Sequence, residues 1–151
     1  MEQTLVILKP DCVQRRLIGR VLARFEDKGL RMVGMKMLHL DRPLAERLYE
    51  VHKGQPFYEP LLAFVTSSPC VVLVIEGESA IKVVRGMLGP TAGTEAPPGT
   101  IRGDFALSAR LNLTHASDSP ESAAREIPLF FSATELLDYR IADDHWVVPP
   151  A

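Results

Sequence analysis

Short apolar runs alternate with longer amphipathic stretches along this chain of 151 residues. Residues 4–8 and 70–75 are almost continuous apolar runs, and the second is mostly β-branched, so both predict strands buried on two faces. Residues 31–40 are mostly apolar and predict another strand, and residues 112–115 alternate as a short fourth strand would. The apolar pattern therefore predicts a four-stranded sheet.

Helical periodicity fills the intervals between these strands. Apolar residues from Leu17 to Lys28 keep a spacing of three and four, and Gly29 follows as the expected helix end. Further helices are expected from Pro43, at residues 58–65 and 78–88, and from Pro120. The alternating order predicts an α+β fold, a ferredoxin-like α/β sandwich with a four-stranded antiparallel sheet and helices packed on it.

Composition narrows the class of protein. The length predicts a single domain, residues 1–151, in which residues 139–151 form a polar C-terminal tail. A net charge of −2 gives no strong nucleic-acid signal, and no apolar run is long enough for a membrane span. Cys12 and Cys70 lie far apart without metal-ligand spacing, which is typical of the reducing cytoplasm.

Residues 89–110 do not fit the predicted regular structure. The segment holds Gly93, Gly99 and Gly103 and predicts a long loop, and such loops in compact domains are usually functional. Arg102 lies between the last two glycines, where backbone and guanidinium could approach a phosphate closely. The alternative is that Arg102 braces its own loop through Asp104.

A histidine stands at the predicted junction of a strand and a helix. The alternation puts Leu113 and His115 on one strand face, while Ser119 and Pro120 have the features of a helix start. An imidazole held there can be oriented by a neighbour and remain open to a substrate. The alternative is a histidine that only fills the turn.

Several other residues also have both a functional and a structural interpretation. Lys9 ends a buried strand, Arg85 lies in the last turn of a helix, and Thr91 belongs to the unexplained loop. Lys9 could instead be a solvated lysine at the rim of the sheet, Arg85 could only complement the helix dipole, and Phe57 could cover the core or stack on a base. Together, however, one lysine, two arginines and a threonine suit phosphate oxygens, and one histidine suits a phosphoryl acceptor. A P-loop, the protein-kinase signature set and zinc-ligand spacing are absent.

Several motifs of the chain resemble those of the nucleoside diphosphate kinase family. Residues 4–11 (TLVILKPD) are similar to the first strand of that family and its lysine. Gly89-Pro-Thr91 and residues 98–105 (PGTIRGDF) resemble its phosphate-binding loop. Residues 112–118 (NLTHASD) resemble its active-site signature, in which the histidine is phosphorylated. The similarity extends over residues 2–140 and keeps the order and spacing of the motifs.

The resemblance implies a role for each matching residue. His115 would accept the γ-phosphate of a nucleoside triphosphate and pass it to a nucleoside diphosphate in a ping-pong reaction. Lys9 and Asn112 would hold the sugar 3′-hydroxyl, and Phe57 would stack on the base with broad specificity. The phosphates would be bound by Arg85, Thr91 and Arg102. The supporting residues would be Tyr49, which lines the site, and Ser117 and Glu126, which orient His115. Mg²⁺ would be carried by the nucleotide phosphates without a dedicated protein ligand.

The sequence also departs from the family pattern. Ala116 stands where the family usually has glycine, Leu111 replaces a frequent arginine, and Gly93 lies in a loop segment that lacks a common proline. Pro128 falls inside the helix that carries Glu126, where it would remove one hydrogen bond or kink the axis.

The C-terminal tail suggests an oligomeric state, and the fold leaves an alternative function open. The tail from Tyr139 resembles that of the longer family members, which are generally hexamers, so a homohexamer anchored by Trp146 is expected. The alternative function is a non-catalytic regulatory or nucleic-acid-binding module on the same fold. Four arginines could form its basic face: Arg15, Arg16, Arg20 and Arg24.

Overall fold

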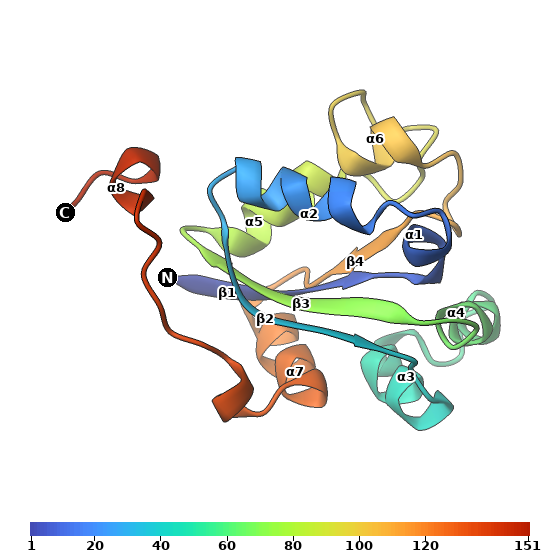
Figure 1. Cartoon of the computed structure of the whole chain (residues 1–151). Helices are drawn as coiled ribbons and strands as arrows, with labels where there is room; N and C mark the ends of the chain where they lie inside the picture. Colours follow the sequence, from blue (N-terminus) through green and yellow to red (C-terminus); the bar gives the residue numbers. More distant parts are fainter.

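The computed structural model describes residues 1–151 and contains one four-stranded sheet, shown in Figure 1. The strands are β1 (Glu2–Leu8), β2 (Arg31–Leu38), β3 (Cys70–Gly77) and β4 (Thr114–Ala116). Their order across the sheet is β2-β3-β1-β4, and all neighbours are antiparallel. The predicted α+β sandwich with a four-stranded antiparallel sheet is confirmed.

Helices cover both faces of this sheet (Figure 1). On one face lie α2 (Ile18–Asp27), α5 (Ala80–Leu88) and the short α6 (Ile101–Phe105). The other face packs against α3 (Arg42–Leu48), α4 (Tyr58–Val65) and α7 (Pro120–Phe130). The remaining elements are α1 (Pro10–Gln14), two 3-10 turns at Glu50–His52 and Ala133–Glu135, and α8 (Asp144–Val147).

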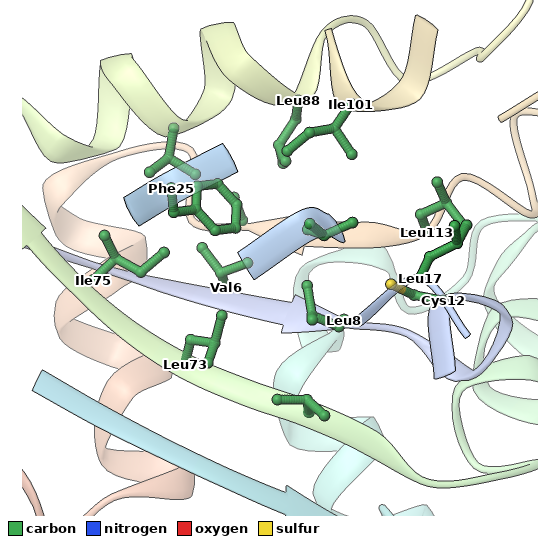
Figure 2. Packing of buried hydrophobic residues seen from close by; sticks show 14 of the residues in the cluster. Val6, Leu8, Cys12, Leu17, Phe25, Leu73, Ile75, Leu88, Ile101 and Leu113 are labelled. Carbon is green, nitrogen blue, oxygen red and sulfur yellow. The ribbon is translucent and has the colours of Figure 1, made fainter. Parts of the chain in front are cut away.

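Both faces of strand β1 are buried, as its uninterrupted apolar run predicts. Val6 and Leu8 belong to the cluster beneath α2 and α5, in which Figure 2 shows Phe25 near Val6 and Ile75. Leu5 and Ile7 belong to the cluster beneath α3, α4 and α7. Alternate residues thus fill two separate cores, so both faces of the strand must be apolar.

Three short helices, α1, α6 and α8, are not predicted from the sequence. The segment 89–110, predicted as a long loop, contains α6. Its N-cap is Thr100, whose Oγ1 accepts a hydrogen bond from Gly103 N at 3.0 Å. The backbone of Pro97 lies so close to Gly103 that a side chain there would not fit. Asp11 lies inside α1, whose cap position is Lys9.

The short fourth strand also differs from its prediction. It begins at Thr114 instead of Asn112, because Leu113 has a φ of +72°, outside the extended region. His115 pairs with Ile7 and turns toward α7, whereas Leu113 is buried in the cluster beneath α2 and α5. The prediction that Leu113 and His115 share one face is therefore wrong.

The C-terminal tail leaves α7 and runs along the outside of β2 (Figure 1). Leu137 N donates to Val33 O at 2.8 Å, and the Tyr139 hydroxyl donates to Met32 O at 2.6 Å. Trp146 is 82% exposed in the single chain. None of the helices is both long and apolar enough to cross a membrane.

Candidate active site

A cavity of about 860 Å³ opens beside the C-terminal end of β1, between β4, α7, α4 and the loop that precedes β4. Nine of the ten predicted site residues line it: Lys9, Tyr49, Phe57, Arg85, Thr91, Arg102, Asn112, His115 and Glu126. The tenth, Ser117, is fully buried behind Glu126. The fold thus gathers residues that are up to 117 positions apart, from Lys9 to Glu126, around one cavity.

His115 lies in the middle of this cavity wall. Its Nε2 is 2.8 Å from Glu126 Oε1, and a carboxylate oxygen can only accept, so we assign the ring proton to Nε2. Nδ1 is then the ring nitrogen that keeps a free lone pair. The imidazole also lies nearly perpendicular to the Tyr49 ring, with 5.6 Å between the centroids. Burial raises the pKa of the Tyr49 hydroxyl, so Tyr49 stays neutral beside the histidine.

Glu126 is held by several contacts at once. Ser117 Oγ donates to Glu126 Oε1 at 3.0 Å, and Leu5 N donates to Ser117 Oγ at 3.2 Å. Arg125 lies 3.6 Å from the second carboxylate oxygen and also donates to the carbonyls at the C-terminal end of α3. Pro128 does interrupt the hydrogen bonding of α7, yet the carboxylate still reaches His115.

The start of α7 follows the sequence prediction. Ser119 Oγ accepts from Ser122 N at 3.1 Å, and Pro120 occupies the first helical turn. Since β4 ends only three residues before Ser119, this cap fixes the distance between His115 and the helix that supplies Glu126.

Lys9 is not the solvated lysine of the alternative interpretation, since it is only 5% exposed. Its Nζ donates to Asn112 Oδ1, and Asn112 Nδ2 donates to Thr91 O at 3.0 Å. Burial lowers the pKa of the Lys9 ammonium to about 8, although the nearby Asp11 carboxylate acts to raise it. Lys9, Asn112 and Thr91 therefore form a chain of contacts along one wall of the cavity.

Arg102 is buried and donates to three backbone carbonyls. Its Nε, Nη1 and Nη2 reach Asn112 O, Gly89 O and Thr114 O at 3.2, 3.0 and 2.7 Å. The interpretation that Arg102 braces its loop through Asp104 is wrong, because Asp104 pairs with Arg24. Burial, reinforced by Arg85, lowers the pKa of the Arg102 guanidinium to about 10, so it remains charged near neutral pH.

Arg85 is the more exposed of the two arginines, and its Nη1 donates to Ala116 O at 3.1 Å. The backbone on either side of His115 is therefore anchored by cations, Arg102 at Thr114 and Arg85 at Ala116. The remaining donors of both guanidinium groups can serve an anion in the cavity.

Much of the remaining lining is apolar. Phe57 is 46% exposed, so it does not act as a cover on the core. Further apolar lining comes from Pro60, Leu61 and Phe64 of α4 and from Ala109 and Leu111. The cavity thus combines cations with an apolar surface and a half-exposed aromatic ring.

Sequence reasoning overlooked His52, whose ring meets Phe57 edge-on at 5.2 Å and stacks on Tyr49 at 6.1 Å between centroids. It also overlooked Arg125. Neither residue belongs to a recognisable motif, because their contacts depend on how α3, α4 and α7 pack. The position of His52 in the break between two predicted helices was the one available signal.

The departures from the family pattern are compatible with this geometry. Ala116 is buried and is not among the residues with positive φ, so a methyl group causes no backbone strain there. Gly93 is pinned by a hydrogen bond from its nitrogen to Ser108 O, and Ala106 leaves no space for a side chain. Leu111 is exposed and adds an apolar surface to the cavity.

Comparison with known proteins identifies the family. Residues 2–136 match the family model described as nucleoside diphosphate kinase. The chain belongs to the nucleoside diphosphate kinase family. It is 58% identical over 137 residues to a nucleoside diphosphate kinase of Methanocaldococcus jannaschii, covering 91% of this chain and 98% of the relative. It is 54% identical over 147 residues to one of Roseiflexus castenholzii, covering 97% and 99%.

Solved structures of nucleoside diphosphate kinases share the whole fold. A halophilic nucleoside diphosphate kinase from Halobacterium salinarum in complex with CDP superposes with a TM-score of 0.95 at 44% identity, covering 97% of this chain and 98% of the other. A family protein from Babesia bovis gives a TM-score of 0.94 at 40% identity, covering 98% and 100%.

Proposed function

We propose that this nucleoside diphosphate kinase transfers a phosphoryl group through a covalent intermediate on His115. In the first half-reaction the Nδ1 lone pair attacks the γ-phosphorus of a nucleoside triphosphate, and the bond to the bridging oxygen breaks to release the diphosphate. In the second, a terminal oxygen of another nucleoside diphosphate attacks the same phosphorus, and the N–P bond breaks. One site serves both steps in turn, which predicts ping-pong kinetics.

The contact between His115 Nε2 and Glu126 carries this proposal. A ring whose Nε2 donates to a buried carboxylate presents Nδ1 unprotonated, and the carboxylate stabilises the positive charge that the ring acquires during attack. The same arrangement can release the phosphoryl group to either nucleotide, so the enzyme maintains the balance among nucleoside triphosphates.

The cations of the lining suit the phosphates of either nucleotide. Arg85 and Arg102, with the hydroxyl of Thr91, would bind phosphate oxygens, while Lys9 and Asn112 would hold the sugar 3′-hydroxyl. Transfer of a phosphoryl group depends mainly on positioning and on neutralising charge, and the three cations around one cavity supply both.

The apolar part of the lining suits the base. Phe57 presents a half-exposed ring, and aromatic stacking accepts any base because every base has a π-face. Broad base specificity is therefore expected, and a panel of nucleoside diphosphates that showed one strongly preferred base would contradict it.

Mg²⁺ would reach the site on the nucleotide phosphates. The cationic donors of the cavity fit a metal-bound triphosphate, and no group of three or more His, Cys, Asp or Glu residues is placed to hold a metal ion. When bound, the metal would neutralise phosphate charge, and the chain's own lysine and arginines would orient the phosphates around it.

We also infer an organisation for the whole chain. Residues 1–151 would form one domain, with residues 139–151 as a tail, and six copies would assemble with Trp146 contacting a neighbour. Its 82% exposure in the single chain supports such a contact. A mass from light scattering that matches a dimer or tetramer would contradict the hexamer. Two buried, unpaired cysteines support a cytoplasmic location.

A non-catalytic binding module has less support. Of the four arginines considered for its basic face, Arg15 donates to Phe105 O, and Arg24 pairs with Asp104 and donates to Gly99 O. These two therefore hold α6 in place and have fewer donors for a nucleic acid.

Intact mass spectrometry after mixing with Mg-ATP tests the mechanism. The wild type should gain about 80 Da, the mass of one phosphoryl group, in an acid-labile form that GDP removes. The His115→Ala variant should gain nothing, and His39→Ala, a surface histidine bonded to Thr66 O, should behave as the wild type. An unlabelled wild type, or a label that persists in His115→Ala, would refute a phosphohistidine at this position.

A further inference from the structure

Asp11 makes an unexpected contact for a residue in the first turn of a helix. Its carboxylate does not cap α1 but crosses to the segment before β4, where Oδ2 accepts from Leu113 N at 3.0 Å. The other oxygen, Oδ1, is buried without a hydrogen-bond partner. Asp11 does not line the cavity, so its effect on a substrate must pass through other residues.

The residue that Asp11 holds has a strained backbone. Leu113 has a φ of +72°, and Thr114 N donates to Asn112 O across it at 2.8 Å. A hydrogen bond between residues two apart with this φ is the pattern of a classic γ-turn, which is rare and strained. A branched residue such as leucine disfavours a positive φ, and such strain is typical of functional sites.

Both peptide groups of Leu113 are tied to the end of β1. Asp11 accepts from the Leu113 nitrogen, and Lys9 N donates to the Leu113 carbonyl at 2.8 Å. The leucine side chain is fully buried in the cluster that includes Leu17 and Cys12, as Figure 2 shows. Backbone contacts and core packing thus stabilise a conformation that leucine alone would avoid.

This turn determines where two residues of the cavity point. Asn112 precedes Leu113 and His115 follows Thr114, and both line the same cavity although Leu113 between them packs into the opposite layer. An extended Leu113 would restore simple alternation and change the direction of Asn112 relative to His115. The turn therefore sets the spacing between the residue that contacts Lys9 and the nucleophile.

Asp11 has a second effect, through its charge. Besides the Asp11 carboxylate, the ionisable groups that influence Lys9 are the Arg102 guanidinium and the Cys70 thiol. Burial and the Arg102 guanidinium together lower the pKa of Lys9 to about 8, although the Asp11 carboxylate, the strongest opposing influence, acts to raise it. Loss of this charge would bring the pKa of Lys9 closer to neutral pH.

We propose that Asp11 is a positioning residue of the active site: its carboxylate holds the strained Leu113 turn that aims Asn112 and His115, and it places a negative charge beside the Lys9 ammonium. The proposal rests on the function proposed above, because it concerns the same cavity.

Two conservative variants separate these effects. Asp11→Asn keeps an oxygen that can accept from Leu113 N but removes the charge, whereas Asp11→Glu keeps the charge and displaces the acceptor by one methylene group. Asp27→Asn, an exposed carboxylate of α2, is the matched control. For each, the rate of His115 phosphorylation by Mg-ATP is followed by rapid quenching and intact mass between pH 6 and pH 10.

Asp11→Asn should be within about twofold of the wild type at pH 6.5, where most of Lys9 is charged in both, and its alkaline decline should move about 1 pH unit lower. Asp11→Glu should be roughly 10-fold slower at pH 6.5 because the turn is displaced, and its alkaline decline should not move. Asp27→Asn should superimpose on the wild type throughout.

Different results would contradict the role of the Asp11 charge and the role of its hydrogen bond to Leu113 N. An unmoved alkaline decline in Asp11→Asn would remove the role of the charge, and a wild-type rate at pH 6.5 in Asp11→Glu would remove the role of the hydrogen bond. Failure of the wild type itself to label His115 would instead refute the proposed function, whatever the variants do.

Discussion

The contribution of the Glu126 carboxylate can be measured by replacing it with an amide of the same shape. Glu126→Gln keeps an oxygen that can accept from His115 Nε2 and Ser117 Oγ, so the geometry of the site is retained. What is lost is the negative charge beside a ring that becomes positively charged as Nδ1 bonds to phosphorus. The variant should therefore bind nucleotides normally and transfer the phosphoryl group slowly.

The size of the effect follows from Coulomb's law. Two unit charges about 4 Å apart interact by about 4 kcal/mol at an effective dielectric constant of about 20. Glu126 is only 4% exposed, so solvent screening is weak. With about half of the ring charge developed at the transition state, the loss is about 2 kcal/mol, which corresponds to a roughly 30-fold slower phosphorylation.

Rapid-quench intact mass measures this rate directly, and the dependence on ATP concentration separates binding from transfer. Glu121→Gln is the matched control, because Glu121 is an exposed carboxylate in the first turn of the same helix. A Glu126→Gln rate within threefold of the wild type, or an equal loss in Glu121→Gln, would refute the electrostatic argument.

Three further changes have expected results. Arg102→Ala leaves three carbonyls without their donor, so the free energy of unfolding should fall by about 3 kcal/mol; an unchanged denaturation midpoint would contradict this. Phe57→Ala should raise KM roughly 10-fold for every base with little change in kcat, and a loss confined to one base would contradict simple stacking. Burial raises the pKa of the Cys12 and Cys70 thiols to about 12 from 9.0. The folded chain therefore retains protons that the unfolded chain loses above pH 9, so stability should fall between pH 9 and 12, and less steeply in a Cys12→Ala/Cys70→Ala variant.

The parts of the fold that the sequence predicts are those determined by local pattern. The helix at Tyr58–Val65 has the predicted bounds, and α7 starts at the predicted Ser119 cap. The three missed helices are short: α1 and α6 have five residues each, and α8 has four. Five residues make little more than one turn, so apolar periodicity cannot show.

The types of residue in the site could be predicted, but their pairings could not. A histidine at a strand–helix junction and cations at strand and helix ends are visible along the chain. The contact between Lys9 and Asn112 joins residues 103 positions apart, and that between Arg24 and Asp104 joins residues 80 apart. The second of these pairs shows why Asp104 was assigned to the wrong arginine: sequence proximity favoured Arg102, while the packing of α2 against α6 brought Arg24.

A clear conflict between pattern and structure lies beside the proposed nucleophile. Residues 112–115 alternate as a strand should, and leucine disfavours a positive φ, so both local signals oppose the turn at Leu113. The turn exists because Asp11 and Lys9, more than a hundred residues earlier, bind both of its peptide groups. A local preference that is overridden by distant, buried contacts is expected where function requires a particular geometry. The residues that follow β1 therefore impose the direction of His115 relative to Asn112, and this is why strand alternation predicts the wrong face for His115.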